Sequence, residues 1–417
     1  MRVLVLGSGG REDVIARMIA EKNEVFVLPG NGGTAEYAVN IPGSVLDKEC
    51  VLRACQDNDI EYVVVTPDDP LAAGMVDHLS SHGYRCFGPD QKAARIESSK
   101  SFAKELMKSY SIPTAAYESF TDVESALGYL KTQSLPVVIK ADGLALGKGV
   151  VIAETEADAE EAVRSMLTDG RFGDAGRKII IEEFLTGPEV TVLAFTDGET
   201  VVPMISSMDH KGAYDGDTGP NTGGMGVIAP NPFYTDALAD ECMEKIFLPT
   251  IRAMKAEGCP FRGCLYFGLM LTPSGPEVIE YNSRFGDPEA EAVLPLLDSD
   301  LLTIMNAVTD SHLSEIEVRW KKGASAVVVA ASSGYPGKYG KGREITIGDE
   351  SGVNVFIAGA ERKNGHLYTS GGRVLCVQAC GDDLPSALEK AYEGISKIHF
   401  DGMEYRHDIG RRALEGK

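Results

Sequence analysis

Four short apolar runs in the N-terminal quarter constrain the fold of this chain more than any other feature. Most of them are rich in β-branched residues, and segments of helix length separate them. The runs are Val3–Leu6, Val25–Leu28, Tyr62–Val65 and Arg85–Phe87. This alternation is typical of parallel strands joined by crossover helices, with both faces of the sheet buried. Residues 1–100 are therefore predicted to form an α/β domain with a parallel sheet.

The pattern changes after residue 100, where strands and helices no longer alternate regularly. The elements expected there are a helix at Lys100–Tyr110, strands at Val137–Lys140, Val150–Ala153 and Lys178–Glu182, a hairpin of Leu265–Leu271 with Glu277–Tyr281, strands at Ala326–Ala331, Val353–Ile357 and Arg373–Gln378, and a helix over 385–398. A second module is predicted to begin near Ser101, and a smaller α+β domain to follow Gly323.

Charge and cysteine usage exclude several classes of partner. The 417 residues carry a net charge of −22, which argues against nucleic acid and against an anionic membrane surface. No run reaches the ~18–20 apolar residues of a membrane helix, and the apolar run at the N-terminus is too short for a signal peptide. The eight cysteines include no Cys-x-x-Cys pair and are expected to be reduced. We expect a cytoplasmic protein whose anionic substrate binds a locally basic or amide-rich pocket.

Two glycine-rich turns follow the first two predicted strands, at Gly7–Glu12 and Pro29–Gly33. The first is not a dinucleotide fingerprint, because Glu12 stands where that motif needs its third glycine. Either turn alone could be a plain strand connection. Together, at the carboxyl edge of one sheet, they favour a small phosphate-bearing ligand held by backbone amides.

A second glycine-rich segment, Lys140–Val150, joins a strand that ends in lysine to a further strand. It is not a P-loop, because only three residues separate Gly143 from Gly147 and a glycine follows Lys148. Glycines let a backbone close over phosphates and lysines neutralise them, so the segment predicts a phosphate-covering flap. The alternative is a solvated hairpin with two surface lysines.

Two acidic segments complete the candidate nucleotide site. Glu182–Leu185 leads through a turn to Glu189, and this connection could offer hydrogen bonds to an adenine and a ribose, or could simply be solvated. Glu280 and Asn282 lie two apart on one strand and share a face, which suits Mg²⁺. Arg284 could reach an anion beside the metal. The alternative is an edge strand with polar residues facing water.

The segment from Asp209 to Pro232 is rich in Gly, Asp, Asn and Pro and is longer than most idle loops. It reads as too polar for the core. We interpret it as a lid that closes over charged substrates, with a linker as the alternative. The chain shows no Ser-His-Asp or Cys-His order, so nucleophilic hydrolysis is not expected.

These motifs, in this order, resemble the phosphoribosylamine–glycine ligases, a family of the ATP-grasp superfamily. The resemblance extends almost from end to end, and its most specific motifs are Gly219–Gly226 and Arg284–Glu289. It implies an α/β and α+β multidomain protein. The implied parts are an N-terminal parallel-sheet α/β domain (1–100), a two-part ATP-grasp core (101–322) with a flap subdomain (about 114–188), and a C-terminal α+β domain (323–417).

The resemblance also implies a reaction. ATP would phosphorylate the carboxylate of glycine, and the amine of 5-phosphoribosylamine would attack the acyl phosphate, giving glycinamide ribonucleotide, ADP and phosphate in de novo purine biosynthesis. Mg²⁺ or Mn²⁺ would assist. Glycine and 5-phosphoribosylamine would be the only partners of a monomer or weak homodimer.

The resemblance also implies which residues bind ATP and the metal and which residues contact glycine and 5-phosphoribosylamine. ATP would be held by Lys104, Lys140, Lys148, Glu182, Phe184, Leu185 and Glu189, and the metal by Glu280 and Asn282. The substrates would meet Gly9, Gly10, Pro29, Gly30, Asn31, Asp209 and Arg284. The catalytic residues would be Arg284, Lys140 and Asp209.

The chain departs from the usual family pattern mainly where the family binds its amine and glycine. The departures are at Asp13, Thr66, Asp68, Gly212, Ala290, Glu291 and Ile357. They leave three alternatives open. These are a ligase with a different amine acceptor, an ATP-grasp ligase that uses bicarbonate or formate in place of glycine, and a catalytically silent nucleotide-binding homologue.

Overall fold

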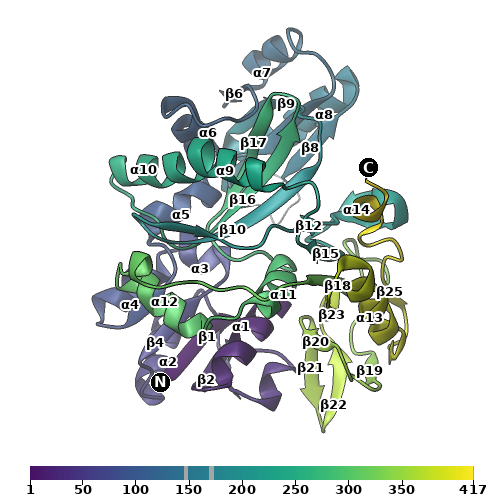
Figure 1. Cartoon of the computed structure of the whole chain (residues 1–417). Helices are drawn as coiled ribbons and strands as arrows, with labels where there is room; N and C mark the ends of the chain where they lie inside the picture. The colour runs from purple at the N-terminus through teal and green to yellow at the C-terminus, as the bar shows by residue number, and fades with distance from the viewer. Residues whose placement is uncertain (145–148, 169–172, 417) are drawn as a thin grey trace.

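The computed structural model describes residues 1–144, 149–168 and 173–416 (Figure 1). Its N-terminal part is a five-stranded sheet in the order β3-β2-β1-β4-β5, and every pair is parallel. The elements of this part are β1 (Arg2–Gly7), α1 (Gly10–Ala20), β2 (Glu24–Pro29), β3 (Val39–Asn40), α2 (Lys48–Asp57), β4 (Tyr62–Val65), α3 (Asp68–Ala72), α4 (Met75–Ser81), β5 (Arg85–Phe87) and α5 (Gln91–Ser98).

Both faces of this sheet are buried, as the apolar runs predict. Val3 and Val5 pack in the cluster that contains α1, whereas Leu4 and Leu6 pack with α2 and α4 on the opposite face. Because successive side chains of a strand point to opposite faces, an uninterrupted apolar strand needs cover on both sides. The strands therefore present only their ends to ligands.

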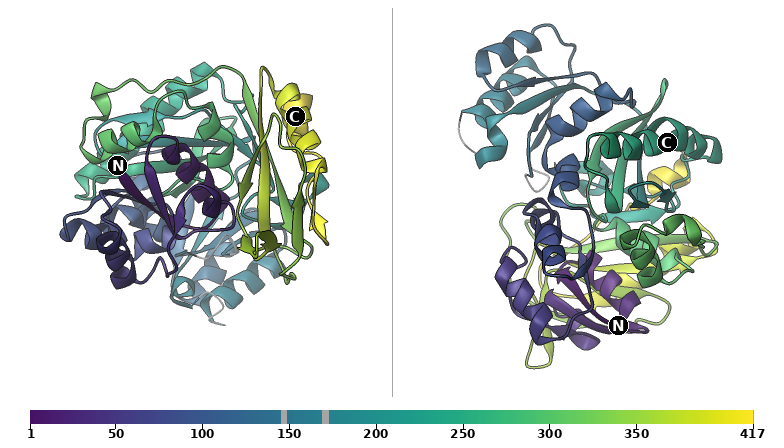
Figure 2. Two further views of the ribbon diagram at one scale, coloured as in Figure 1. Left: turned by 90° about the horizontal axis from the view of Figure 1, so that it is seen from below. Right: turned by 90° about the vertical axis from the view of Figure 1, so that its left-hand side faces the viewer.

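Two antiparallel sheets form the middle of the molecule. The first has the order β6-β9-β7-β8, with α7 and α8 on one face, and Figure 2 shows it projecting from the rest. Its elements are β6 (Tyr117–Phe120), α7 (Val123–Leu130), β7 (Val137–Ala141), β8 (Val150–Ala153), α8 (Glu156–Leu167), η2 (Gly173–Arg177) and β9 (Ile179–Glu183).

The second middle sheet has the order β11-β10-β16-β17 and packs against α6, α9 and α10. Its elements are α6 (Lys100–Ser109), β10 (Glu189–Asp197), β11 (Val201–Pro203), α9 (Asp236–Cys242), α10 (Leu248–Ala256), β16 (Arg262–Thr272) and β17 (Gly275–Asn282). The predicted hairpin of β16 and β17 is confirmed. Its turn is tighter than expected, because Thr272 pairs with Gly275.

The C-terminal part is built on a sheet in the order β12-β15-β18-β23-β20, with α13 packed against it. A smaller sheet has the order β21-β22-β19-β24. The elements are β12 (Met208–Asp209), β15 (Gly226–Ala229), β18 (Ala324–Ser332), β19 (Glu344–Ile347), β20 (Asn354–Ile357), β21 (Ala360–Lys363), β22 (His366–Thr369), β23 (Arg373–Gly381), α13 (Leu384–Ser396), β24 (Ile398–His399), β25 (Met403–Glu404) and α14 (Arg411–Glu415).

The prediction of an irregular, non-core loop over Asp209–Pro232 is wrong in its last third. Val227, Ile228 and Ala229 are fully buried, and β15 pairs with β18 in antiparallel register. A short ribbon of β13 (Gly212–Tyr214) and β14 (Thr218–Asn221) precedes it. Pairing with a strand far along the chain overrides the local turn composition.

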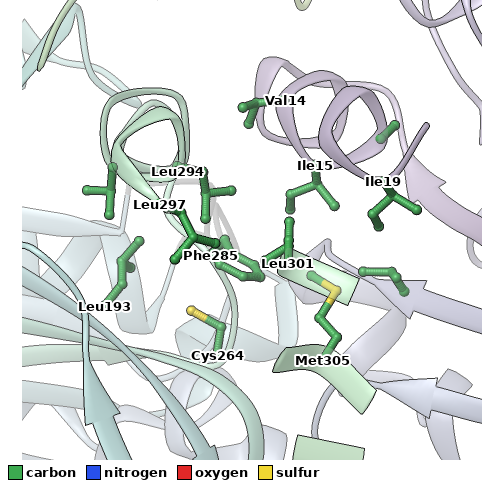
Figure 3. Close-up of a cluster of buried hydrophobic side chains, with 14 of the residues drawn as sticks. Val14, Ile15, Ile19, Leu193, Cys264, Phe285, Leu294, Leu297, Leu301 and Met305 are labelled. Carbon is green, nitrogen blue, oxygen red and sulfur yellow. The ribbon is translucent and has the colours of Figure 1, made fainter. Parts of the chain in front are cut away.

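One hydrophobic cluster joins the N-terminal sheet to the middle of the chain. Figure 3 shows side chains of α1, β10 and β16 pointing toward Phe285 and toward the helical segments that follow it. These segments are α11 (Glu289–Val293), η5 (Leu294–Leu296) and α12 (Leu301–Thr309). The shared core fixes the carboxyl edge of the parallel sheet beside residues 280–291, where the predicted site residues lie. No helix in the described ranges is both long and apolar enough to cross a membrane.

Candidate active site

Three buried side chains form the centre of the predicted nucleotide site. The carboxylate of Glu182 accepts from Lys104 Nζ at 3.1 Å and from Lys140 Nζ at 3.0 Å, both through Oε2. Lys140 and Glu182 are diagonal neighbours on β7 and β9, because Glu182 pairs with Val138. The odd-numbered residues of these strands face α7 and α8, so the even-numbered ones face the site.

The cluster is short of negative charge, because one carboxylate neutralises two buried lysines. Burial lowers the pKa of Lys104 to about 8, with Glu182 opposing this shift and Lys140 adding to it. The second carboxylate oxygen of Glu182, Oε1, is buried and has no hydrogen-bond partner. A buried cation without full compensation is costly, so an anionic ligand such as a polyphosphate is favoured here.

Glu280 and Asn282 share a face of β17, as predicted, and a β-bulge explains why that face is the site. Val278 pairs with Leu269 but Glu280 pairs with Gly268, so Ile279 is the extra residue. The bulge reverses the alternation, and both Val278 and Tyr281 point into the core while Glu280 and Asn282 point away. The freed carbonyl of Ile279 accepts from Lys140 Nζ at 3.1 Å.

The donor set of Glu280 and Asn282 fits a hard divalent cation. Burial raises the pKa of Glu280, but Lys211, Lys140 and Lys100 outweigh it, so the net pKa lies below its usual range and the group is a carboxylate. A carboxylate and an amide oxygen suit Mg²⁺, which completes its shell with water and phosphate oxygens. Within the described ranges, no group of three or more His, Cys, Asp or Glu side chains forms a metal site.

Arg284 lies beside this pair, at the junction with the N-terminal domain. Its guanidinium contacts Asn282 Oδ1 at 3.3 Å and pairs with Glu97 at 3.1 Å. Glu97 in turn accepts from the backbone N–H and the hydroxyl of Ser283, each at 2.8 Å. Arg284 is thus held by fixed partners and is available to an anion next to the metal pair.

Asp209 ends β12 and is half-buried, close to the carboxylate of Glu289. Burial, and then the charge of Glu289, raise the pKa of Asp209 well above its usual range, while Lys211 and Arg373 oppose the rise. Its Oδ1 accepts from the N–H of His210 at 2.7 Å. A carboxyl group whose pKa is raised is better suited than an ordinary one to accept and return a proton.

A cavity of about 420 Å³ lies where the two glycine-rich turns meet the C-terminal domain. Ser8, Gly9, Gly30 and Asn31 line one side, and residues 358–361 line the other, with Asp287 and Arg373 between them. Arg373 pairs with Asp287 at 2.8 Å and also donates to the carbonyls of Gly223 and Gly224. The turns thus lie together at the sheet edge, as predicted.

Not every predicted residue reaches this cavity. Pro29 ends β2 and Gly10 opens α1, and neither lines the cavity. A side chain at position 10 would collide with Glu291, whose Oε1 lies 2.4 Å from the position of a Cβ there. Glycine at position 10 therefore leaves room for the side chain of Glu291.

The remaining predicted nucleotide residues lie at the edge of the site. Phe184 and Leu185 are half-buried in the connection between β9 and β10. Glu189 begins β10 and pairs with Lys211 at 3.3 Å. Lys148 lies outside the described residues. β7 and β8 pair from Lys140 with Val150 onward, so the strands of the predicted flap are confirmed.

Sequence reasoning assigned no role to several residues that the structure brings to the site. Lys100 donates to the carbonyl of Gly143 at 2.8 Å, and burial lowers its pKa although Glu280 opposes this. Lys211 contacts Glu280 at 3.9 Å. Lys100 and Lys211 are close in sequence to the predicted site residues Lys104 and Asp209. This closeness is a signal in the sequence that these two lysines could also belong to the site. Arg373 lies on β23, far along the chain from the other site residues, so closeness in sequence does not point to it.

Two of the departures from the family pattern touch each other. Asp13 Oδ2 accepts from the N–H of Ile357 at 2.6 Å. Glu291 is buried against the cavity wall, where burial and then the charge of Asp287 raise its pKa well above the usual range. The Thr66 hydroxyl donates to the carbonyl of Leu6, away from the cavity.

Comparisons with known proteins agree with this arrangement. Models of the N, ATP-grasp (A) and C domains of phosphoribosylglycinamide synthetase match residues 1–97, 98–290 and 325–412. The chain is 45% identical to a phosphoribosylamine–glycine ligase of Vibrio vulnificus, with 99% of each chain covered. It is 47% identical to the trifunctional purine biosynthetic protein adenosine-3 of Gallus gallus, of which it spans 42%.

Solved structures give the same result. A crystal structure of phosphoribosylamine–glycine ligase from Thermotoga maritima matches with a TM-score of 0.88 and 36% identity, over 98% of this chain and 100% of that one. A biotin carboxylase of Campylobacter jejuni matches with a TM-score of 0.76, over 97% of this chain and 92% of that one, and at 15% identity it supports the ATP-grasp fold alone. The predicted fold class is confirmed, and the chain belongs to the phosphoribosylglycinamide synthetase family.

Proposed function

We propose that this protein is an ATP-dependent ligase that joins glycine to 5-phosphoribosylamine through glycyl phosphate. The products are glycinamide ribonucleotide, ADP and phosphate, in de novo purine biosynthesis. One observation supports this most directly: Lys104, Lys140 and Glu280 converge on one site in a chain that matches a phosphoribosylamine–glycine ligase over 99% of both lengths. ATP use follows from the ATP-grasp family.

The nucleotide half of the reaction depends on preorganised charge. A carboxylate is a poor acylating group until it gains a leaving group. Lys104 and Lys140 bind the phosphates of ATP and offset the charge that shifts to the leaving ADP. Arg284 orients the carboxylate of glycine and the transferred phosphoryl group. Glu280 and Asn282 hold Mg²⁺ or Mn²⁺, which supplies Lewis-acid charge when bound.

The acceptor half depends on the cavity at the sheet edge. Its backbone turns after β1 and β2 suit the phosphate of 5-phosphoribosylamine. Asp209 lies beside Gly224, whose carbonyl Arg373 binds at the cavity wall. Asp209 takes the proton that the amine loses as it attacks the acyl phosphate. Phe184, Leu185 and Glu189 complete the contacts to the nucleoside of ATP.

The test is the release of phosphate from ATP and Mg²⁺ in the presence of glycine and freshly generated 5-phosphoribosylamine. We expect turnover only when both are present. Turnover with another amine and none with 5-phosphoribosylamine rejects the acceptor and keeps the class. Turnover with bicarbonate or formate in place of glycine points to the carboxylase or formate-using alternative, and ATP binding without turnover points to the silent homologue. Cytoplasmic location and a monomeric or weakly dimeric state stay predictions.

A further inference from the structure

One wall of the acceptor cavity is formed by residues 358–361 of the C-terminal domain, which comprise the connection from β20 to β21 and the first two residues of β21, and which we call the turn 358–361. Within its own domain the turn is tied to neighbouring strands, because Ala358 and Gly359 donate to the carbonyls of Val374 and Arg373, and Ala360 pairs with Thr369 of β22. Its position relative to the glycine-rich turns is set by hydrogen bonds across the domain boundary, at Ile357, which precedes the turn, and at Ala360, whose carbonyl accepts from the N–H of Gly32 at 2.8 Å.

Two side chains of the N-terminal domain hold the backbone of Ile357 from both sides. Asp13 Oδ2 accepts from the Ile357 N–H at 2.6 Å, and Asn31 Nδ2 donates to the Ile357 carbonyl at 2.6 Å. Asp13 is fully buried and Asn31 is 9% exposed, so neither bond competes with bulk water. We call Asp13, Asn31 and the Ile357 backbone the Ile357 clasp.

The clasp is itself fixed by its surroundings. Tyr37 donates its hydroxyl to the Asp13 carboxylate, and Arg17 Nη2 lies 3.7 Å from Asp13 Oδ2. A side chain at Gly33 would collide with both Asp13 and Ile357, because its Cβ would lie 3.0 Å from Asp13 Oδ2 and 2.7 Å from Ile357 Cβ. The two domains thus meet in close backbone contact at this point.

The clasp also separates two cavities. On one side lies the acceptor cavity, lined by Asn31 and the turn 358–361. On the other lies a second cavity of about 480 Å³, lined by Arg17, Tyr37 and Ile357 among others. The bond from Asp13 is one of the hydrogen bonds that join this wall to the N-terminal domain, together with those from Asn31 and Gly32, and its loss lets the wall shift toward the second space.

We infer that Asp13 is a positioning residue for the amine acceptor: through the Ile357 N–H it holds the turn 358–361 as the far wall of the acceptor cavity. The inference rests on the proposed function for the identity of the acceptor. It predicts an effect confined to one substrate, since ATP and glycine bind away from this turn. A misplaced wall weakens binding and orientation of the group that it contacts.

The test compares Asp13→Leu with Asp13→Asn. Leucine cannot accept the Ile357 N–H, whereas asparagine can. We expect Asp13→Leu to raise KM for 5-phosphoribosylamine about tenfold, the size of one lost buried hydrogen bond to a charged group, with KM for ATP and glycine changed less than about twofold. Asp13→Asn should restore KM to within about threefold of the wild type.

Hydrogen exchange gives a readout independent of activity. The amide of Ile357, which donates to Asp13, should exchange faster in Asp13→Leu and at the wild-type rate in Asp13→Asn. Val14→Ala is the matched control, because Val14 is a buried neighbour on α1 that packs in the central core, whereas Ile357 packs in the cluster of the C-terminal domain. It should lower stability without changing either readout. If Asp13→Leu yields no folded protein, Asp13→Ser replaces it, since serine is too short to reach the N–H.

Several outcomes overturn the inference. They are an unchanged acceptor KM or unchanged exchange in Asp13→Leu, equal rises in KM for all three substrates, and no recovery in Asp13→Asn. A wild-type protein that never turns over with glycine and 5-phosphoribosylamine rejects the proposed function instead. In that case the exchange data alone decide whether the clasp holds the turn.

Discussion

The two halves of the site are built in different ways. The nucleotide half consists of charged side chains on regular elements, with Lys104 on α6, Lys140 on β7 and Glu182 on β9. The acceptor half consists of backbone turns from two domains, around Gly9, Gly30 and residues 358–361. Charged side chains on regular helices and strands can be identified from the sequence, because residue type and spacing predict both their chemistry and the face on which they lie. Turns that meet across domains depend on tertiary contacts, and Asp13 and Glu291, where the chain departs from the family pattern, lie among these contacts.

If the nucleotide half depends on single charges, Glu280→Gln should show the largest effect. Loss of the carboxylate should lower kcat by about a hundred- to a thousandfold while ATP binding changes little, because the metal stabilises charge in the transition state. Steady-state kinetics and nucleotide titration measure both quantities. The control is Glu199→Gln, which removes an exposed carboxylate from a surface pair. A full-rate Glu280→Gln enzyme rules out the metal assignment.

The shared carboxylate of Glu182 provides a second test. Glu182→Gln removes the carboxylate that hydrogen-bonds both buried lysines, so the free energy of unfolding should fall by about 3 kcal/mol without nucleotide. Added ATP should reduce this loss, because its phosphates replace the missing charge. Urea unfolding with and without ATP measures both. The control is Glu118→Gln on β6, whose side chain is exposed. A loss that ATP does not change means that the phosphates bind elsewhere.

The lysine pair also predicts a pH dependence. The pKa of Lys104 is lowered to about 8 by burial, so the free enzyme loses this cation as pH rises through 8. We expect kcat/KM for ATP to fall about tenfold per pH unit above this point. Lys104→Arg keeps its charge throughout, so its profile should stay flat in the same window. Parallel profiles for the two proteins exclude Lys104 from phosphate binding.

The acceptor half should tolerate a change of charge that the nucleotide half would not. The pKa of Glu291 is raised by burial, so ionisation in the unfolded chain lowers stability as pH rises above about 4.5. Glu291→Gln has no such ionisation. The free energy of unfolding of Glu291→Gln should equal that of the wild type near pH 4. Above about pH 4.5 it should exceed the wild-type value by about 1.4 kcal/mol per pH unit, until Glu291 ionises in the folded protein as well. Urea midpoints across pH measure the difference, and a less stable variant at pH 7 contradicts the burial argument.

The same contrast explains what the sequence predicts. Apolar runs and period-two alternation identify β1, β2, β4 and β5 and place Glu280 with Asn282, because these depend on local pattern. The bulge at Ile279, which decides where that pair points, depends on the register with β16. The residues around β15 have the composition of a turn, and only the pairing with β18 shows that β15 is a strand.

The sequence alone does not predict the place of Arg373 in the site or the contact between Asp13 and Ile357, for a related reason. Arg373 lies on β23 and meets Asp287 from a separate sheet, and a single sequence does not report such pairings. Two-residue strands such as β3 and β12 escape prediction because pairing, not propensity, defines them.

The pairing of β15 with β18 affects how the polypeptide matures on the ribosome. Residues 208–229 leave the ribosome long before β18, the strand that pairs with β15, is synthesised. The edge of β15 therefore stays unpaired during the synthesis of β16, β17 and the helices that follow. A gene fragment beginning at residue 323 encodes a C-terminal sheet whose β18 lacks a neighbour, and such an open edge invites self-association. A fragment that also supplies residues 208–229, as a separate peptide or by fusion, closes that edge.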